Sequence, residues 1–88
     1  MKIVEKKCWP EYFEAVKSGK KKFELRLNDF DIGEGDVLKL REWDPKTKDY
    51  TGREIEKKVT YVKNFTFDNL FGQEAEFKEK GFKVISLE

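Results

Sequence analysis

A short alternating segment, residues 19–27, most constrains how this chain can fold. It opens with Gly19, and from Phe23 to Leu27 apolar and charged side chains alternate at every position. A period of two predicts a half-buried β-strand, with one face against a core and the other displaying a carboxylate between two cations. The residues expected to face the core are Phe23, Leu25 and Leu27, and those expected to face outward are Lys22, Glu24 and Arg26.

The charged face of this strand has two interpretations. Lys, Glu and Arg at a glycine-led strand entrance suit an anionic ligand such as RNA or a nucleotide, because Arg can fork onto a phosphate. They suit a solvated ladder equally well, in which Arg26 pairs with Glu24 or a cross-strand acid for about 0–1 kcal/mol. Residues 1–27 hold eight Lys or Arg against four Asp or Glu, so the basic excess lies around this strand.

The remaining patterns predict strands around one early helix. Pro10 suits the first turn of a helix over residues 10–18, and Gly19 suits its end. Strands are expected over 1–7 (with Ile3 facing inward), 22–27, 37–43, 50–62 and 82–87, with 37–43 and 50–62 paired as a hairpin. One or two short helical turns are expected within 66–80. This order predicts an α+β fold, a small β-barrel of about five to six mostly antiparallel strands.

Length and composition limit the classes of protein. The 88 residues predict one domain, 1–88, whose core depends on eight Phe, three Tyr and two Trp. The lone Cys8 excludes an internal disulfide, is expected to be buried, and fits the cytoplasm. The absence of His excludes His-based proton transfer and His-ligated metals. We expect no cofactor, no metal and no membrane partner, and favour a monomer.

The spacing Gly19-x-Lys21-x-x-Glu24-x-Arg26 resembles the signature of ASCH domains in the PUA-like superfamily. Six ordered blocks together resemble a small uncharacterised ASCH-like family of bacteria and phages. The blocks are Trp9–Phe13, Gly19–Lys21, Phe23–Arg26, Asn28–Asp29, Gly35–Asp36 and Tyr50–Ile55. The resemblance implies a β-barrel flanked by short helices, a cleft near the signature strand, and a role in RNA binding or RNA metabolism.

The candidate ligand-binding residues lie on the signature strand and in the loop after it: Lys21, Glu24, Arg26, Asn28, Asp29 and Phe30. Lys21 and Arg26 are anion ligands or surface ion-pair partners, and Glu24 orients one of them more readily than it acts as a base. Asn28 and Asp29 line the cleft or only stabilise the turn. Phe30 stacks on a base or packs in the core.

The chain departs from the pattern of the family it resembles at positions that matter for chemistry. Members of the family often carry Lys and Arg where Leu27 and Phe30 stand here, and a His near Val4. Some ASCH relatives hydrolyse acetylated cytidine with a Lys and a Thr in the signature strand. Lys21 matches that Lys, but Glu24 occupies the Thr position, so that reaction is disfavoured.

Three functions therefore remain. The favoured one is a binding module, without catalysis, for RNA or a nucleotide-like anion. The second is a hydrolase or nuclease acting on RNA or a modified nucleoside, with Lys21 and Glu24 as the acid/base pair. The third is a protein-interaction domain with exposed aromatic residues.

Overall fold

The computed structural model describes residues 1–65 and 81–88, so the helical turns expected within 66–80 lie outside the described residues. The elements are β1 (Ile3–Cys8), α1 (Pro10–Lys17), β2 (Phe23–Leu27), β3 (Val37–Asp44), β4 (Asp49–Phe65) and β5 (Phe82–Leu87). The predicted order of one early helix among five strands is confirmed, and so is the α+β class. Within the described part of the chain, no helix is long and apolar enough to cross a membrane.

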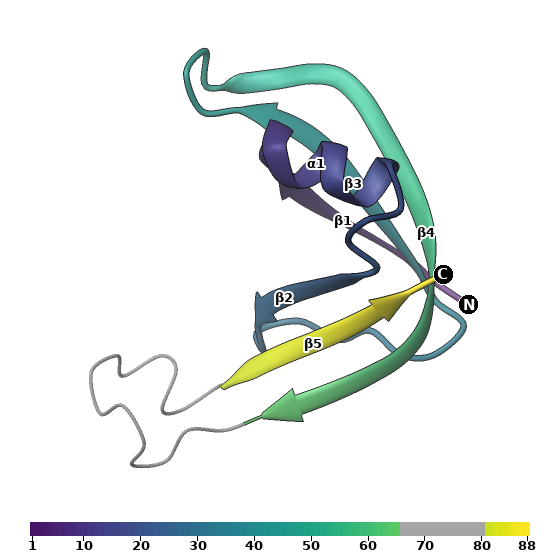
Figure 1. The fold of residues 1–88 in the computed structure, drawn as a ribbon. Helices are drawn as coiled ribbons and strands as arrows, with labels where there is room; N and C mark the ends of the chain where they lie inside the picture. The colour runs from purple at the N-terminus through teal and green to yellow at the C-terminus, as the bar shows by residue number, and fades with distance from the viewer. Residues whose placement is uncertain (66–80) are drawn as a thin grey trace.

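The five strands form one open sheet in the order β1-β3-β4-β5-β2. β1 pairs with β3 in parallel, and the other three pairings are antiparallel, including the predicted β3–β4 hairpin. The long β4 belongs to both halves: its first part pairs with β3 and its last part with β5. It curves from one half into the other, so the two halves enclose an angle (Figure 1).

A β-bulge in β4 reverses which side chains face the core. The register shifts between Val59 and Tyr61, where β4 passes from one half of the sheet to the other. Up to the bulge, the odd-numbered Ile55 and Val59 pack inward; after it, the even-numbered Val62 does so. A bulge adds one unpaired residue and bends the strand, which accounts for both the curve and the change of parity.

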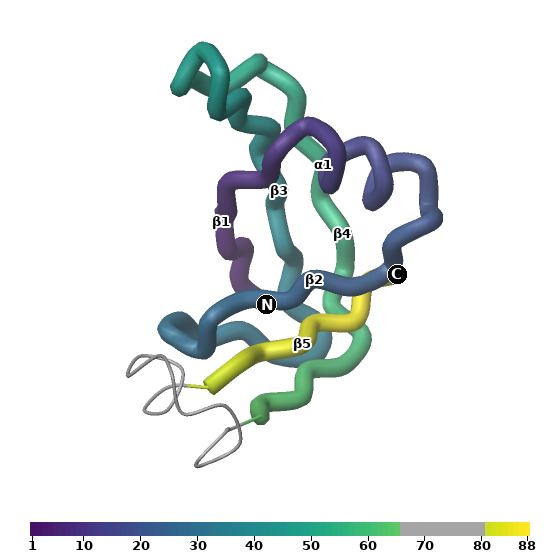
Figure 2. Tube along the Cα trace, turned by 60° about the vertical axis from the view of Figure 1, so that its left-hand side comes forward, coloured from purple at the N-terminus to yellow at the C-terminus, as the bar shows by residue number. Residues whose placement is uncertain are grey.

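α1 lies in the angle between the two halves of the sheet (Figures 1 and 2). The hydrophobic core includes two side chains of this helix, Phe13 and Val16. Its buried members are Cys8, Phe13, Val16, Ile32, Leu38, Leu40, Val59, Ile85 and Leu87. Burial of Cys8 is confirmed. The expectation of an aromatic core is wrong for the described residues, because most of the buried side chains are aliphatic. Ile3 is also exposed, contrary to expectation, because β1 turns Val4 and Cys8 inward instead.

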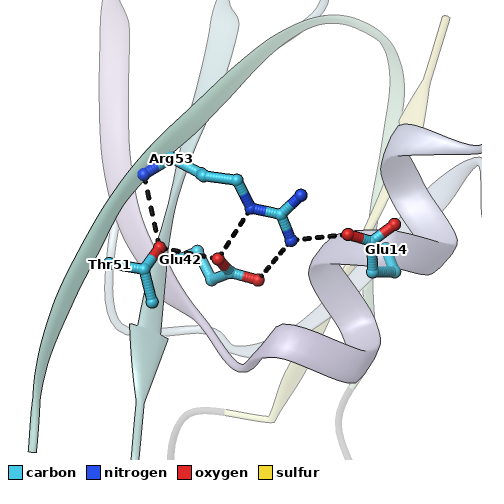
Figure 3. Close-up of polar contacts among 4 residues, drawn as sticks. All are labelled: Glu14, Glu42, Thr51 and Arg53. Atoms are coloured by element: carbon cyan, nitrogen blue, oxygen red, sulfur yellow. Dashed lines mark hydrogen bonds and ion pairs between the residues drawn. The ribbon is translucent and has the colours of Figure 1, made fainter.

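A buried carboxylate joins α1 to the β3–β4 hairpin (Figure 3). Glu42 accepts two hydrogen bonds from Arg53, Nε to Oε1 at 2.9 Å and Nη2 to Oε2 at 2.8 Å. Thr51 Oγ1 donates to the same Oε1 at 2.6 Å, and Arg53 also bonds Glu14 of the helix. The bonds from Arg53, supported by Thr51, outweigh burial and lower the pKa of Glu42 from 4.5 to about 2.

Candidate functional site

A cleft of about 660 Å³ runs along the edge of β2, facing the segment that joins β1 to α1. Its volume lies within the range of roughly 300–1,000 Å³ typical of small-ligand sites. Nine residues line it: Lys7, Cys8, Trp9, Tyr12, Lys21, Phe23, Glu24, Leu25 and Arg26. The signature strand therefore forms one wall of the cleft, and the start of the helix forms another.

The end of α1 brings Lys21 into the cleft. The helix stops at Lys17, and Gly19 has a φ of 83°, in the left-handed region that glycine adopts without a Cβ penalty. The chain then turns back, and the Lys21 N–H donates to the carbonyl of Ala15 at 2.9 Å. The predicted helix end at Gly19 is confirmed, and this reversal directs the next residues towards β2.

Glu24 is the central polar group of the cleft. Only 3% of the residue is exposed. Lys21 Nζ lies 2.9 Å from its Oε1, and Arg26 Nε lies 2.8 Å from its Oε2, so each carboxylate oxygen has its own cation. The expected pairing of Arg26 with Glu24 is confirmed, but as a partly buried pair rather than a surface ladder.

The predicted orientation of β2 is wrong. Phe23 and Leu25 are exposed, whereas Glu24 is buried. The register explains this, because Glu24 lies opposite Ile85 of β5, whose side chain is fully buried in the core. Residues paired across antiparallel strands share a face, so Glu24 must point inward.

Aromatic rings surround the cationic end of the cleft. Lys21 Nζ lies 5.1 Å from the ring centre of Tyr12 and 5.4 Å from that of Phe23. At these distances a lysine gains about 0.5–1 kcal/mol per ring at an exposed site. Tyr12, Phe23 and Trp9 are each about half-exposed, which leaves ring surface available to a ligand.

The chemistry of the site favours holding a ligand over moving protons. Both oxygens of Glu24 already accept from cations, so neither is presented to a substrate proton as a general base requires. Burial, followed by the charge of Glu24, raises the pKa of the Cys8 thiol to about 11, so it is not a thiolate nucleophile near neutral pH. Residues 1–65 and 81–88 contain no group of acidic or sulfur side chains arranged to hold a metal ion.

The loop residues expected in the same cleft lie elsewhere. Asn28 and Asp29 are held by backbone bonds, from Asn28 N to Gly81 O at 3.0 Å and from Asp29 N to Leu27 O at 2.9 Å. Phe30 packs against the core, with Lys6 Nζ 3.8 Å from its ring centre. None of the three lines the cleft.

The sequence of the chain matches the model of the DUF3850 family, a domain of unknown function, over residues 3–78. The chain belongs to the DUF3850 family. Among solved structures, the crystal structure of hypothetical protein PH0355 resembles it, with a TM-score of 0.70 and 24% identity, covering 100% of this chain and 98% of that one. At that identity the likeness shows a shared fold. No curated protein matches the chain.

Six residues that line this DUF3850 cleft were not among the predicted site residues: Lys7, Cys8, Trp9, Tyr12, Phe23 and Leu25. Tyr12 shares the apolar spacing of Phe13 and Val16, which suggested burial for all three, yet only Phe13 and Val16 are buried. One feature of the sequence could have indicated Trp9 as a cleft residue. It lies immediately before a helix that leads into the signature strand.

Proposed function

We propose that this protein binds RNA or a nucleotide-like anion in the cleft along β2, as a binding module rather than an enzyme. One observation carries the proposal: the buried Glu24 carboxylate holds Lys21 and Arg26 in place beside half-exposed aromatic rings. Fixed cations next to aromatic surface suit a ligand that joins a phosphate to a planar base.

The electrostatics of the cleft supports an anionic ligand. The charges of Lys21, Arg26 and Glu24 leave one net positive charge, and partial burial reduces its screening by water. Arg26 is fixed twice, because its Nε bonds Glu24 and its Nη2 bonds the carbonyl oxygen of Lys7. A guanidinium already held in place loses less side-chain entropy when a phosphate binds.

The proposed fold family is the ASCH branch of the PUA-like superfamily, with the bent sheet as its β-barrel. The Gly19-to-Arg26 signature supports this assignment, and so does the position of a cleft beside the signature strand. The bond from Arg26 of β2 to Lys7 of β1 also links the two edge strands of the sheet, which a barrel would bring together. A cytoplasmic location stays a prediction from the sequence.

The two alternatives have less support. A hydrolase or nuclease needs a free acid or base, and Glu24 and Lys21 are already bonded to each other. A protein-interaction domain would be favoured by an apolar patch away from the signature strand, but exposed Tyr61 and Phe65 of β4 lie on the same face of the sheet as Phe23 and Leu25 of that strand.

The test is a binding titration with the four ribonucleoside monophosphates and a labelled oligouridylate, at low and high salt. Lys21→Ala and Arg26→Ala are each expected to weaken binding about tenfold or more, the size of a lost charge-assisted hydrogen bond. Lys20→Ala is the matched control, since Lys20 is exposed beside the cleft but does not line it. It is expected to change affinity by about twofold or less.

Affinity that does not depend on salt, or that Lys20→Ala and Lys21→Ala weaken equally, would refute the cleft as the binding site. Cleavage of the oligonucleotide that is lost in Glu24→Gln would favour the hydrolase instead. The same titration therefore separates the binding module from the enzyme.

A further inference from the structure

The half of the sheet made by β2, β5 and the end of β4 has one side towards the core and another with exposed apolar side chains. Its inner side carries Glu24, Lys83 and Ile85, all buried. Side chains paired across antiparallel strands point to the same side, so the register identifies the opposite side. This side, termed the outer face, is formed chiefly by Phe23, Leu25, Val84, Tyr61, Lys63 and Phe65.

The outer face leaves large apolar side chains in water. The exposed fractions are 47% for Phe23, 53% for Leu25, 55% for Tyr61 and 43% for Phe65. Isolated surface hydrophobics are ordinary, but several on one face of a sheet, here on the two strands that flank β5, mark an interaction surface.

The other half of the sheet shows that this patch is local. Its outward side chains include Lys39, Arg41 and Glu54, joined by ion pairs of 3.4 Å from Lys39 to Glu54 and 3.1 Å from Arg41 to Glu54. That half therefore presents a charged surface to water.

Cations lie on the outer face and at its rim. Lys63 occupies its middle row, opposite Val84, and its Nζ lies 5.9 Å from the ring centre of Phe65. Lys21 lies beside Phe23 at the rim. None of the six residues that form the face is acidic. Aromatic rings interleaved with cations are what proteins use to bind single-stranded nucleic acid, by stacking bases and neutralising phosphates.

The position of Lys63 argues against a second copy of this chain as the occupant. A two-fold interface pairs each surface with itself, so one centred on the outer face would bring two Lys63 ammonium groups together away from water. A phosphate backbone would neutralise the same group. The charge of the face thus favours a polyanion over a self-complementary dimer.

The outer face is continuous with the cleft. Phe23 and Leu25 belong to both, because β2 is the edge strand around which the two surfaces meet. We infer that the outer face is a stacking surface for unpaired bases of a single-stranded RNA whose neighbouring nucleotide occupies the cleft. The inference rests on the proposed function of that cleft and extends it from one nucleotide to several.

The experiment compares two probes, UMP for the cleft alone and a labelled oligouridylate of about 12 nucleotides for the cleft and face together. Tyr61→Ala and Phe65→Ala are each expected to weaken oligouridylate binding by about 5- to 150-fold, the value of one lost stacking contact. Both are expected to leave UMP affinity unchanged. Tyr61→Phe keeps the ring and is expected to keep the affinity.

Tyr50→Ala is the matched control, since Tyr50 is an exposed aromatic residue on the same strand but in the charged half, next to Arg41. It is expected to change neither affinity. If an alanine variant is too unstable to assay, Lys63→Ala is tested instead. The slope of the logarithm of its binding constant against the logarithm of salt concentration is expected to be smaller than that of the wild type by about one.

Oligouridylate affinity that stays within about twofold in Tyr61→Ala and Phe65→Ala overturns the inference, and so does an unchanged salt slope in Lys63→Ala. A wild-type dimer that Tyr61→Ala dissociates also overturns it, because the face would then be a protein interface. The cleft proposal survives any of these results if Lys21→Ala still weakens UMP binding. It fails separately if Lys21→Ala has no effect on UMP.

Discussion

Replacing Glu42 with Gln tests whether one buried carboxylate fastens the helix to the hairpin. The change keeps the shape of the side chain and an acceptor oxygen for Thr51, but removes the negative charge that Arg53 binds through two hydrogen bonds. The decrease in the free energy of unfolding should therefore measure the contribution of the negative charge rather than that of side-chain packing.

The pKa of Glu42 sets the size and the pH range of the effect. The pKa of Glu42 is lowered from 4.5 to about 2, and each pKa unit corresponds to about 1.4 kcal/mol. The ionised carboxylate can therefore contribute at most roughly 3 kcal/mol to the free energy of unfolding. The Arg53 side chain is 43% exposed, so solvent screening reduces the expected contribution to about 1–2 kcal/mol. Because the folded pKa is lowered, this stability is fully present above pH 4.5 and is lost as the pH falls through about 2.

Urea unfolding of the wild type and of Glu42→Gln, at several pH values between about 7 and 2.5, measures the difference directly. The free energies of unfolding should differ by about 1–2 kcal/mol at neutral pH, and more than half of that difference should vanish near pH 3. Glu56→Gln, an exposed glutamate on the same strand as Arg53, is the control and should show no such trend. A difference that does not change with pH would refute the role of the charge.

Two further predictions concern the glycine that follows α1 and the buried thiol that lines the cleft. Gly19→Ala should lower the free energy of unfolding by about 1–2 kcal/mol in urea titrations, since Gly19 has a φ of 83°. Gly33→Ala should leave the free energy of unfolding unchanged, because its Cβ would meet only Asp36 Oδ2, at 3.9 Å. Equal losses of stability in the two variants would contradict the explanation from the positive φ of Gly19. Cys8, with its pKa raised to about 11, should react with a thiol reagent at about pH 8 some 100-fold more slowly in the folded protein than in urea. A rate unaffected by urea would contradict its burial and its raised pKa.

The sequence alone predicts the features that depend on residues close together along the chain. The end of α1 at Gly19 follows from local backbone preference, and the grouping of Lys21, Glu24 and Arg26 follows from their spacing around the start of β2. Both could be inferred without knowing which strands pair.

The orientation of β2 was predicted wrongly, because strict alternation favours the apolar face for the core, whereas the pairing of the strand decides which face is buried. That choice depends on the pairing of Glu24 with Ile85 in β5, and on the bulge between Val59 and Tyr61 that sets the parity of β4. The cleft residues Trp9 and Tyr12 were missed for the same reason, since their exposure depends on where β2 lies relative to the helix.

The measurement that tests the cleft most directly is an NMR titration of the labelled protein with UMP, followed at the two tryptophan indole N–H signals. Trp9 lines the cleft, whereas Trp43 lies on β3 outside its lining, so each molecule contains its own control. Binding in the cleft predicts that the Trp9 signal shifts with saturation while the Trp43 signal stays in place. A shift of Trp43 without Trp9, or no shift of either signal at millimolar UMP, would contradict the proposed site.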